Sequence, residues 1–225
     1  MTGVYSDAGW RQSRARPMSE NDLQPAGELN PMYEVELKFA VSGRAALERR
    51  LVELGGRLAE PQEQVDRYFA HPCRDFAQTD EALRLRRVGD SVAITWKGPR
   101  IDAATKTRRE IELELAPLPA ALDAGPTLSS WTELLEALGF RRVMEVAKRR
   151  QPLRLVWQGA EVDVALDTVA GLGEFLELEI MAAEGEVPAA RARLESLAQE
   201  IGLGPTERRS YLELILQSQP AGQPR

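Results

Sequence analysis

The 225-residue sequence contains one cysteine, Cys73, and one histidine, His71. A single cysteine excludes an intrachain disulfide and a cysteine-rich zinc site, and a single histidine excludes a metal centre built from several histidines. Aromatic residues make up only 6% of the chain. No run of about 18 apolar residues occurs, so the sequence predicts no membrane-spanning helix. Its chemistry must therefore depend mainly on carboxylates, Lys, Arg and Tyr, with or without a metal bound through oxygen.

The charge balance is acidic: 35 Asp and Glu against 29 Lys and Arg give a formal net charge of -6. Nucleic-acid-binding domains are usually basic, so we do not expect a nucleic acid or a membrane as partner. Residues 1–30 show no sustained periodicity and no apolar segment of a secretory signal. We expect a disordered N-terminal extension over 1–30, one folded domain over 31–217, a disordered tail over 218–225, and a cytoplasmic location.

Charged and apolar residues alternate along much of the remaining sequence. In segment 33–40, Glu34, Glu36 and Lys38 share one face of a predicted strand, and apolar residues occupy the other. The same period of two recurs in residues 64–69, 83–88, 91–97, 108–115, 146–150, 154–157, 161–166 and 175–181. The charged side chains at matching positions are Glu34, Glu36, Lys38, Arg84, Arg86, Lys97, Arg108, Glu110, Glu112, Glu114, Lys148, Arg150, Asp163, Asp167, Glu177 and Glu179.

The alternation has two readings. For one strand, a charged face is usually the solvated face of an antiparallel sheet. Because the pattern is repeated in strand after strand, we expect a sheet closed on itself, with charged groups in the lumen and apolar faces packed outward against helices. The expected fold class is α+β. Predicted helices cover 43–54 with Ser42 as cap, the segment from Ser129 or Ser130 to Gly139, Pro188 to about Ile201, and 207–217.

Such a lumen would combine the groups that phosphoryl chemistry needs. Glu34 and Glu36 project side by side and, with Glu177 or Glu179, could hold Mg²⁺ or Mn²⁺. Arg binds phosphate oxygens with two N–H groups, and Lys binds them as a point charge. The candidates for this role are Arg84, Arg86, Lys97, Lys148 and Arg150. The sequence contains no P-loop motif, so side chains would have to hold the phosphates.

An ordered set of motifs resembles the CYTH superfamily, the triphosphate tunnel metalloenzymes. Glu34-Val35-Glu36-Leu37-Lys38 matches the ExExK signature of that family. The other matching segments are Gln64-x-Asp66-x-Tyr68, Leu83-Arg84-Leu85-Arg86, Trp96-Lys97-Gly98-Pro99, Arg108-x-Glu110-x-Glu112, Lys148-x-Arg150, Asp167, Gly171-Leu172-Gly173-Glu174-Phe175-x-Glu177-x-Glu179 and Arg209-Ser210-Tyr211. The Gly-Leu-Gly-Glu-Phe segment and the terminal Arg-Ser-Tyr are most similar to the class IV adenylate cyclase branch.

The resemblance implies a closed eight-stranded antiparallel β-barrel that forms a hydrophilic triphosphate tunnel, with flanking α-helices. It implies Mg²⁺ or Mn²⁺ as cofactor. The implied metal ligands are Glu34, Glu36 and Glu177, with Glu179 sharing or replacing the role of Glu177, and with Glu110 and Glu112 as metal or water organisers. The implied triphosphate-binding residues are Lys38, Arg84, Arg86, Lys97, Lys148 and Arg150. The catalytic candidates are Glu34, Glu36, Lys38 and Asp167, the last of which resembles a tunnel acid near the reacting end.

The resemblance leaves the reaction open between members that share these groups. The leading expectation is a class IV adenylate cyclase, in which the ribose 3′-hydroxyl of ATP attacks the α-phosphorus to give cAMP and pyrophosphate. The first alternative is a triphosphatase that hydrolyses the terminal phosphoryl group of tripolyphosphate or thiamine triphosphate. The second is a non-catalytic module that binds polyphosphate or nucleotide. A homodimer formed through the outer helices is a further expectation.

Overall fold

The computed structural model describes residues 32–101, 107–115 and 127–218. All of these belong to the unit Pro31–Arg225. The predictions made for residues 1–30 and for residues 219–225 of the tail lie outside the described residues. Ser218, which was predicted as the first residue of the tail, is the last residue of a helix.

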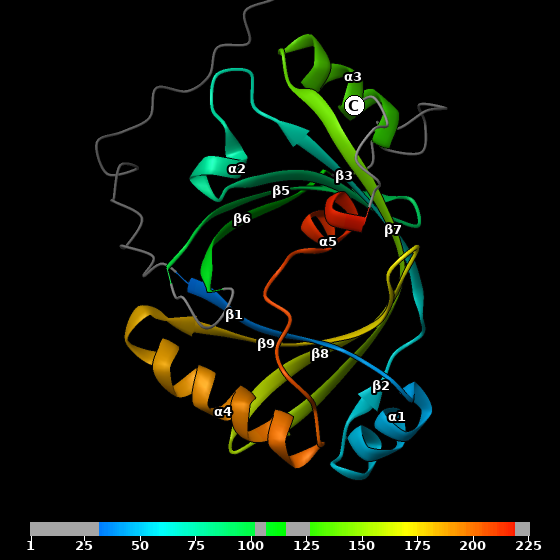
Figure 1. Ribbon diagram of the computed structural model, residues 1–225, viewed down its shortest axis with the longest axis vertical. Helices are drawn as coiled ribbons and strands as arrows, with labels where there is room; N and C mark the ends of the chain where they lie inside the picture. Colours follow the sequence, from blue (N-terminus) through cyan, green and yellow to red (C-terminus); the bar gives the residue numbers. More distant parts are fainter. Residues whose placement is uncertain (1–31, 102–106, 116–126, 219–225) are drawn as a thin grey trace, which may run out of the picture. The chain divides into compact units, whose positions relative to one another are not determined.

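The described residues form nine strands in one antiparallel sheet (Figure 1). These are β1 Met32–Ala40, β2 Arg57–Leu58, β3 Gln62–Ala70, β4 Ala82–Val88, β5 Ser91–Arg100, β6 Arg108–Leu115, β7 Arg141–Trp157, β8 Ala160–Val169 and β9 Gly173–Ala183. Their order is β2-β7-β3-β4-β5-β6-β1-β9-β8, and β8 pairs back onto β7. Eight strands therefore close into a barrel, with β2 as an extra strand on β7. The predicted closed eight-stranded barrel is confirmed.

Strand β7 closes the ring because it is long enough to serve two neighbours. It spans 17 residues and pairs with β3 through its first part, up to Arg150. From Lys148 onward it pairs with β8. The charged stretch around residues 148–150 is therefore held by a neighbour on each side, which fixes the direction of its side chains.

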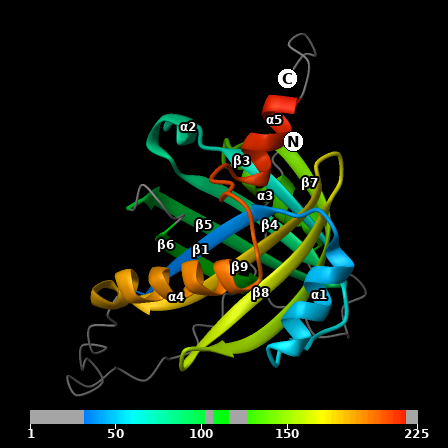
Figure 2. The same ribbon diagram turned by 60° about the horizontal axis from the view of Figure 1, so that its bottom comes forward.

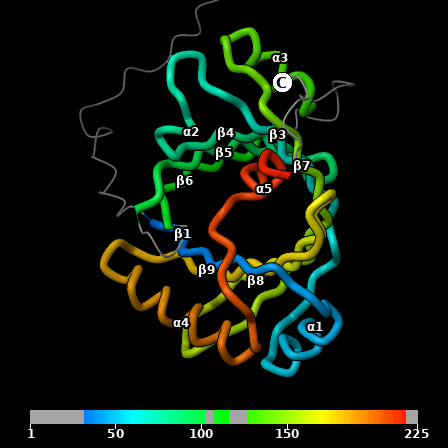
Figure 3. The backbone as a smooth tube through the Cα atoms, viewed as in Figure 1, coloured from blue at the N-terminus to red at the C-terminus, as the bar shows by residue number. Residues whose placement is uncertain are grey.

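The helices lie at the outer face and at one mouth of the barrel. They are α1 Arg44–Glu53, α2 Phe76–Thr79, α3 Leu128–Ala137, α4 Val187–Glu200 and α5 Tyr211–Ser218, with a 3₁₀ turn at Glu184–Glu186. Figure 2 shows α1 and α4 outside the wall that contains β8 and β9. In the tube drawing, the chain runs from α4 across the barrel opening to α5 (Figure 3). No helix among the described residues is long and apolar enough to cross a membrane.

Two of the predicted helix caps are wrong. Helix α1 begins after Gly43, whose φ of 86° is left-handed, and no side chain caps it, so Ser42 does not have the predicted role. Helix α3 is capped by Thr127, whose Oγ1 accepts a hydrogen bond from Ser130 N, and not by Ser129 or Ser130. The expectation for α4, with Pro188 in its first turn, is confirmed.

Helix α5 starts four residues later than predicted because a capping box fixes its first turn. Ser210 N donates to Glu213 Oε2 at 2.6 Å, and Glu213 N donates to Ser210 Oγ at 3.1 Å. These reciprocal bonds satisfy two backbone donors at the helix start. They place Tyr211 at the first helical position.

The hydrophobic core is divided among separate clusters. The first packs the outer faces of β1, β7, β8 and β9 against α1 and α4, with Leu37, Leu51, Leu178 and Leu194 almost fully buried. The second lies under α2 and α3. The third joins Tyr211 of α5 to residues of β3, β7, β8 and β9. The alternation that buries apolar residues on the outer face of the wall leaves the interior to charged groups.

Candidate active site within the barrel

The barrel contains a cavity of about 1660 Å³. The predicted site residues that line it are Glu34, Glu36, Lys38, Arg84, Arg86, Lys97, Glu110, Glu112, Lys148, Arg150, Glu177 and Glu179. Asp167 is fully buried and lies behind this lining. Asp163 and Glu114, which share the same alternation, do not line the cavity and are exposed. The structure thus brings nearly the whole predicted set into one cavity.

Two facing strands of this space carry opposite charges. Along the ring, β4 is four strands from β9 in either direction, so these two strands face each other. Strand β9 carries Glu177 and Glu179, and β4 carries Arg84 and Arg86. A ligand in the bore would therefore contact carboxylates on one side and guanidinium groups on the other.

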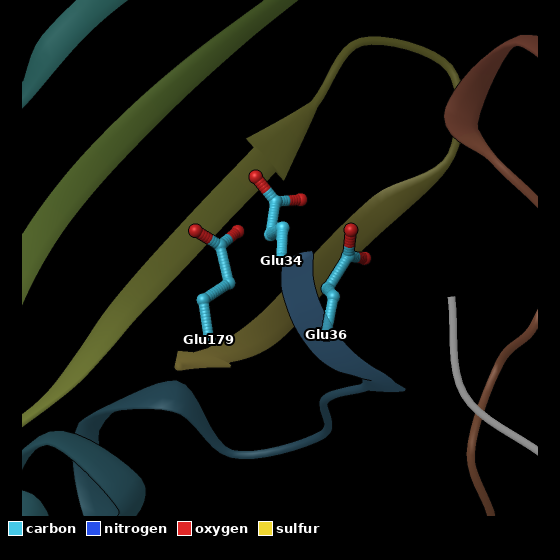
Figure 4. Close-up of side chains that lie close together, drawn as sticks. All are labelled: Glu34, Glu36 and Glu179. Atoms are coloured by element: carbon cyan, nitrogen blue, oxygen red, sulfur yellow. The ribbon is translucent and has the colours of Figure 1, made fainter. Parts of the chain in front are cut away.

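Three carboxylates on β1 and β9 form a compact group (Figure 4). Glu34 and Glu36 follow each other on the inner face of β1, and Glu179 is the cross-strand neighbour of Glu36. One oxygen from each lies within 4.8 Å of those from the other two. Burial, together with the charge of Glu34, raises the pKa of Glu179 well above its ordinary value.

This group fits a hard divalent cation. Carboxylate oxygens are the ligands that Mg²⁺ and Mn²⁺ prefer, and a cation among them would relieve the repulsion between buried like charges. Burial alone would raise the pKa of Glu34, but the charges of Lys97 and Arg84 outweigh it and lower the pKa. Glu34 is therefore ionised and ready to bind a cation.

The other predicted metal ligands lie outside this three-carboxylate group and contact basic or hydroxyl side chains. Glu177 accepts a hydrogen bond from Arg150, and Glu110 accepts one from Lys97. Glu112 accepts a 2.7 Å hydrogen bond from Thr95 Oγ1. These three acids are thus placed to orient neighbouring side chains.

Asp66 anchors the basic side of the cavity and was not predicted as a site residue. Its carboxylate accepts two hydrogen bonds from Arg86, at 2.6 and 2.8 Å. It also lies 3.6 Å from Arg84 and 3.8 Å from Lys148. Burial would raise the pKa of Asp66, but Arg84, Arg86 and Lys148 together lower it. Two sequence signals point to Asp66: its inward position between Gln64 and Tyr68, and its place in the family-matching segment Gln64-x-Asp66-x-Tyr68.

Asp167 is a second buried anchor. It accepts hydrogen bonds of 2.8 and 2.6 Å from Arg150, and one of 3.0 Å from the Tyr211 hydroxyl. Lys148 Nζ lies 3.6 Å from Asp167 Oδ2. The structure therefore places this predicted catalytic acid where it can orient cations, without contact with the cavity itself.

Lys148 lies between the two buried aspartates, yet cations dominate its surroundings. Burial and the charges of Arg150 and Arg86 outweigh Asp66 and Asp167 and lower the pKa of Lys148 to about 7. Burial alone would lower the pKa of Lys97 as well, but Glu34 and Glu110 raise it above its ordinary value. The two lysines therefore differ in how readily each exchanges a proton near neutral pH.

Lys38 contacts the C-terminal segment. Its side chain is almost fully buried, and its ammonium group donates to the carbonyl of Arg209. The same group lies 4.1 Å from the ring centre of Tyr211 and 5.7 Å from that of Phe175. The terminal Arg-Ser-Tyr motif indicated Tyr211 without assigning it a role.

Comparison with known proteins gives consistent results. Residues 32–211 match the CYTH domain family. Adenylate cyclase CyaB of Aeromonas hydrophila is 30% identical over 192 residues, covering 83% of this chain and 90% of that protein. A protein of Methanocaldococcus jannaschii, named as a candidate adenylate cyclase, is 34% identical over 148 residues, or 66% of this chain and 77% of that one.

A solved structure shows the same architecture. The PH1819 protein from Pyrococcus horikoshii OT3 matches with a TM-score of 0.70 and 39% sequence identity. The match covers 83% of this chain and 99% of that chain. The fold is thus shared over almost the entire length of that protein.

Proposed function

The chain belongs to the CYTH family, and from this premise we propose that it is a metal-dependent class IV adenylate cyclase that converts ATP into cAMP and pyrophosphate. The observation that carries the proposal is the arrangement of the cavity. A group of three carboxylates on β1 and β9 shares the cavity with arginines and lysines on β4, β5 and β7. This arrangement suits a polyanion accompanied by a divalent cation.

Glu34, Glu36 and Glu179 would hold Mg²⁺ or Mn²⁺. When bound, the ion supplies positive charge that neutralises phosphate oxygens as the reaction proceeds. Arg84, Arg86, Lys148 and Arg150 would bind the polyphosphate from the other side. Because Asp66 and Asp167 already hold these cations in place, little rearrangement is needed when charge develops on the substrate.

In the proposed reaction, the ribose 3′-oxygen bonds to the α-phosphorus. The bond from that phosphorus to the bridging oxygen of the β-phosphate breaks, and pyrophosphate leaves. The hydroxyl proton is released. The cations on the basic side would stabilise the negative charge that builds up on the departing pyrophosphate.

The size and lining of the cavity favour a nucleotide over bare tripolyphosphate. At about 1660 Å³ the cavity exceeds the range of roughly 300–1,000 Å³ that is usual for small-molecule pockets. Its lining includes Phe76, Met144 and Leu212 besides the charged groups. Apolar side chains can contact a nucleoside, whereas inorganic tripolyphosphate offers them nothing to bind. The name of the Aeromonas relative points the same way.

Product analysis tests the proposal. The protein is incubated separately with ATP, tripolyphosphate and thiamine triphosphate, each with Mg²⁺ or Mn²⁺. Formation of cAMP and pyrophosphate from ATP supports the cyclase. Orthophosphate released from tripolyphosphate or thiamine triphosphate favours the triphosphatase alternative. Tight binding without turnover of any of the three, by folded protein, contradicts an enzyme and leaves the binding module.

Charge removal at the acidic side tests the metal role separately. Glu34→Gln and Glu36→Gln keep the side-chain shape and remove a ligand charge. We expect both variants to lose turnover while they still bind tripolyphosphate in metal-free buffer. Glu114→Gln is the matched control, because Glu114 is exposed and does not line the cavity. Unchanged turnover in Glu34→Gln and Glu36→Gln would contradict the metal role.

A further inference from the structure

The segment before α5 is attached to the end of β1. Glu207 N donates to Lys38 O at 2.6 Å, and Thr206 forms a bridge with Phe39. Two residues further on, the carbonyl of Arg209 accepts a hydrogen bond from the Lys38 ammonium group. Both the backbone and the side chain of Lys38 thus contact the C-terminal segment. At the start of α5 in this segment, Tyr211 lines the cavity.

Tyr211 contacts two lysines of the cavity at once. Its ring centre lies 4.1 Å from Lys38 Nζ and 5.1 Å from Lys148 Nζ. Its hydroxyl donates to Asp167 at 3.0 Å, and its ring packs edge-on against Phe175 at 5.1 Å between centres. The residue is 5% exposed, so water does not screen these contacts strongly. An aromatic face attracts an ammonium group, most strongly where both are desolvated.

The ammonium group of Lys148 needs to be oriented because the side chain is flexible and two carboxylates lie close to it. Asp66 and Asp167 both lie within 3.8 Å of Lys148, and each could draw its ammonium group away from a ligand. An aromatic ring orients an ammonium group without neutralising its charge. The ring therefore leaves that charge available to attract an incoming anion, whereas a carboxylate would compete with the anion.

We propose that Tyr211 is a positioning residue of the polyphosphate site, whose ring holds Lys38 and Lys148 at the cavity surface while its hydroxyl fixes the ring to Asp167. The inference rests on the proposed function in assuming a polyphosphate ligand. It adds the C-terminal segment to the anion site, with Tyr211 acting through the two lysines.

The test is the binding of inorganic tripolyphosphate, measured by calorimetry in metal-free buffer at a pH below the pKa of Lys148. Tyr211→Phe keeps the ring, so we expect its dissociation constant to stay within about threefold of the wild-type value. Tyr211→Leu removes the ring, and we expect binding to weaken about tenfold or more. Ile215→Ala is the matched control on the same helix. Ile215 packs in the same cluster but does not line the cavity, and we expect wild-type affinity.

A double-mutant cycle separates positioning from general support of the fold. The Lys148→Met variant lacks one of the two lysines that the Tyr211 ring positions. In this background, Tyr211→Leu should therefore weaken tripolyphosphate binding by a smaller factor than in the wild-type background. Equal factors in both backgrounds would overturn the proposal. If Tyr211→Leu fails to fold, Tyr211→Met takes its place in the cycle, because Met fills irregular space without an aromatic face.

The outcomes distinguish this inference from the proposed function. If the wild-type protein binds no tripolyphosphate, the inference is overturned at its assumed ligand, while the product analysis with ATP and metal decides the proposed function separately. If the wild type binds tripolyphosphate and Tyr211→Leu binds it equally well, the inference alone is overturned. The inference is supported if tripolyphosphate binding is weaker in Tyr211→Leu and close to wild type in Tyr211→Phe, and if Tyr211→Leu has a smaller effect in the Lys148→Met background.

Discussion

Asp66 accepts two hydrogen bonds from Arg86, at 2.6 and 2.8 Å, at a place where the aspartate is 1% exposed. The same carboxylate lies near Arg84 and Lys148, so one acid of β3 orders cations from both of its neighbouring strands, β4 and β7. The basic side of the cavity therefore depends on a residue that does not line it.

We predict that Asp66→Asn is both less stable and weaker in anion binding. Removing one partner of a buried ion pair leaves buried cations uncompensated and costs about 3–5 kcal/mol. The free energy of unfolding from urea titration and the tripolyphosphate affinity from calorimetry should both fall. Asp163→Asn is the matched control, since Asp163 pairs with Arg154 at 2.6 Å where both side chains are largely exposed. Equal effects of the two substitutions would contradict the role of Asp66.

Asp66 also gives the stability a dependence on acid pH. Its pKa in the folded protein lies below the ordinary value of 3.8. The stabilisation is therefore present above that ordinary value and is lost as the pH falls toward the folded-state pKa. We expect the stability difference between wild type and Asp66→Asn to shrink below about pH 4. A difference that stays constant between neutral and acid pH in urea titrations would argue against this explanation.

Glu179→Gln should make the metal-free protein more stable and reduce the stabilisation that metal binding provides. Three carboxylates within 4.8 Å repel one another, and a neutral amide removes part of that repulsion. Without metal, the variant should unfold at a higher temperature than wild type. Addition of Mg²⁺ or Mn²⁺ should raise the unfolding temperature of the wild type more than that of the variant, because a ligand that binds the folded state stabilises it. Thermal unfolding with and without chelator measures both effects, and an equal metal response in the two proteins would exclude Glu179 as a ligand.

Binding of tripolyphosphate should take up a proton at Lys148. In the free protein its pKa is about 7, below the ordinary value of 10.5, and an adjacent polyanion raises it. Between the pKa of the free protein and the higher pKa in the complex, the complex holds more protons than the free protein, so affinity falls as the pH rises above about 7. Lys148→Arg keeps its charge and should lose this component. Calorimetry in buffers of different ionisation heat counts the protons, and identical counts for both proteins would refute the assignment.

Gly56→Ala should weaken the fold and leave the site intact. A Cβ at Gly56 would lie 2.7 Å from Leu51 O and 2.9 Å from Leu153 Cδ2, where α1 packs against β7. Overpacking of this kind costs about 1–3 kcal/mol. Gly185→Ala is the control, because a Cβ there meets nothing within 4 Å. We expect a lower midpoint of urea unfolding for Gly56→Ala with unchanged tripolyphosphate affinity; a midpoint equal to that of the control would disprove the close approach.

The barrel was predictable because alternation is a local property. The sequence of each strand shows which of its faces is charged. A closed barrel is the arrangement in which all of the charged faces line one lumen. The positions of Glu34, Glu36, Arg84 and Arg86 follow from that rule. What each of these residues contacts does not follow from it.

The contacts depend on strand register and on long-range folding. Glu36 faces Glu179, whereas Glu177 contacts Arg150, and the alternation is the same for both β9 residues. Asp66 becomes an anchor only because β3 lies between β4 and β7. Tyr211 reaches Lys38 from a part of the chain more than 170 residues away, through a segment without periodicity. The capping box at Ser210 and Glu213 would have indicated the start of α5 from the sequence.

On β1, alternate residues have different roles. Val35, Leu37 and Phe39 pack in the hydrophobic core outside the barrel. Glu34, Glu36 and Lys38 line the cavity inside it. The residues that stabilise the fold and the residues that form the site therefore alternate along one strand. During evolution, substitutions at the inward-facing positions can change the ligand specificity of the cavity and leave the outward-facing core residues unchanged. Evolution can also remodel α1 and α4, which contribute no residue to the cavity lining, without disturbing the ligand. A scaffold divided in this way can acquire new substrates while its architecture stays the same.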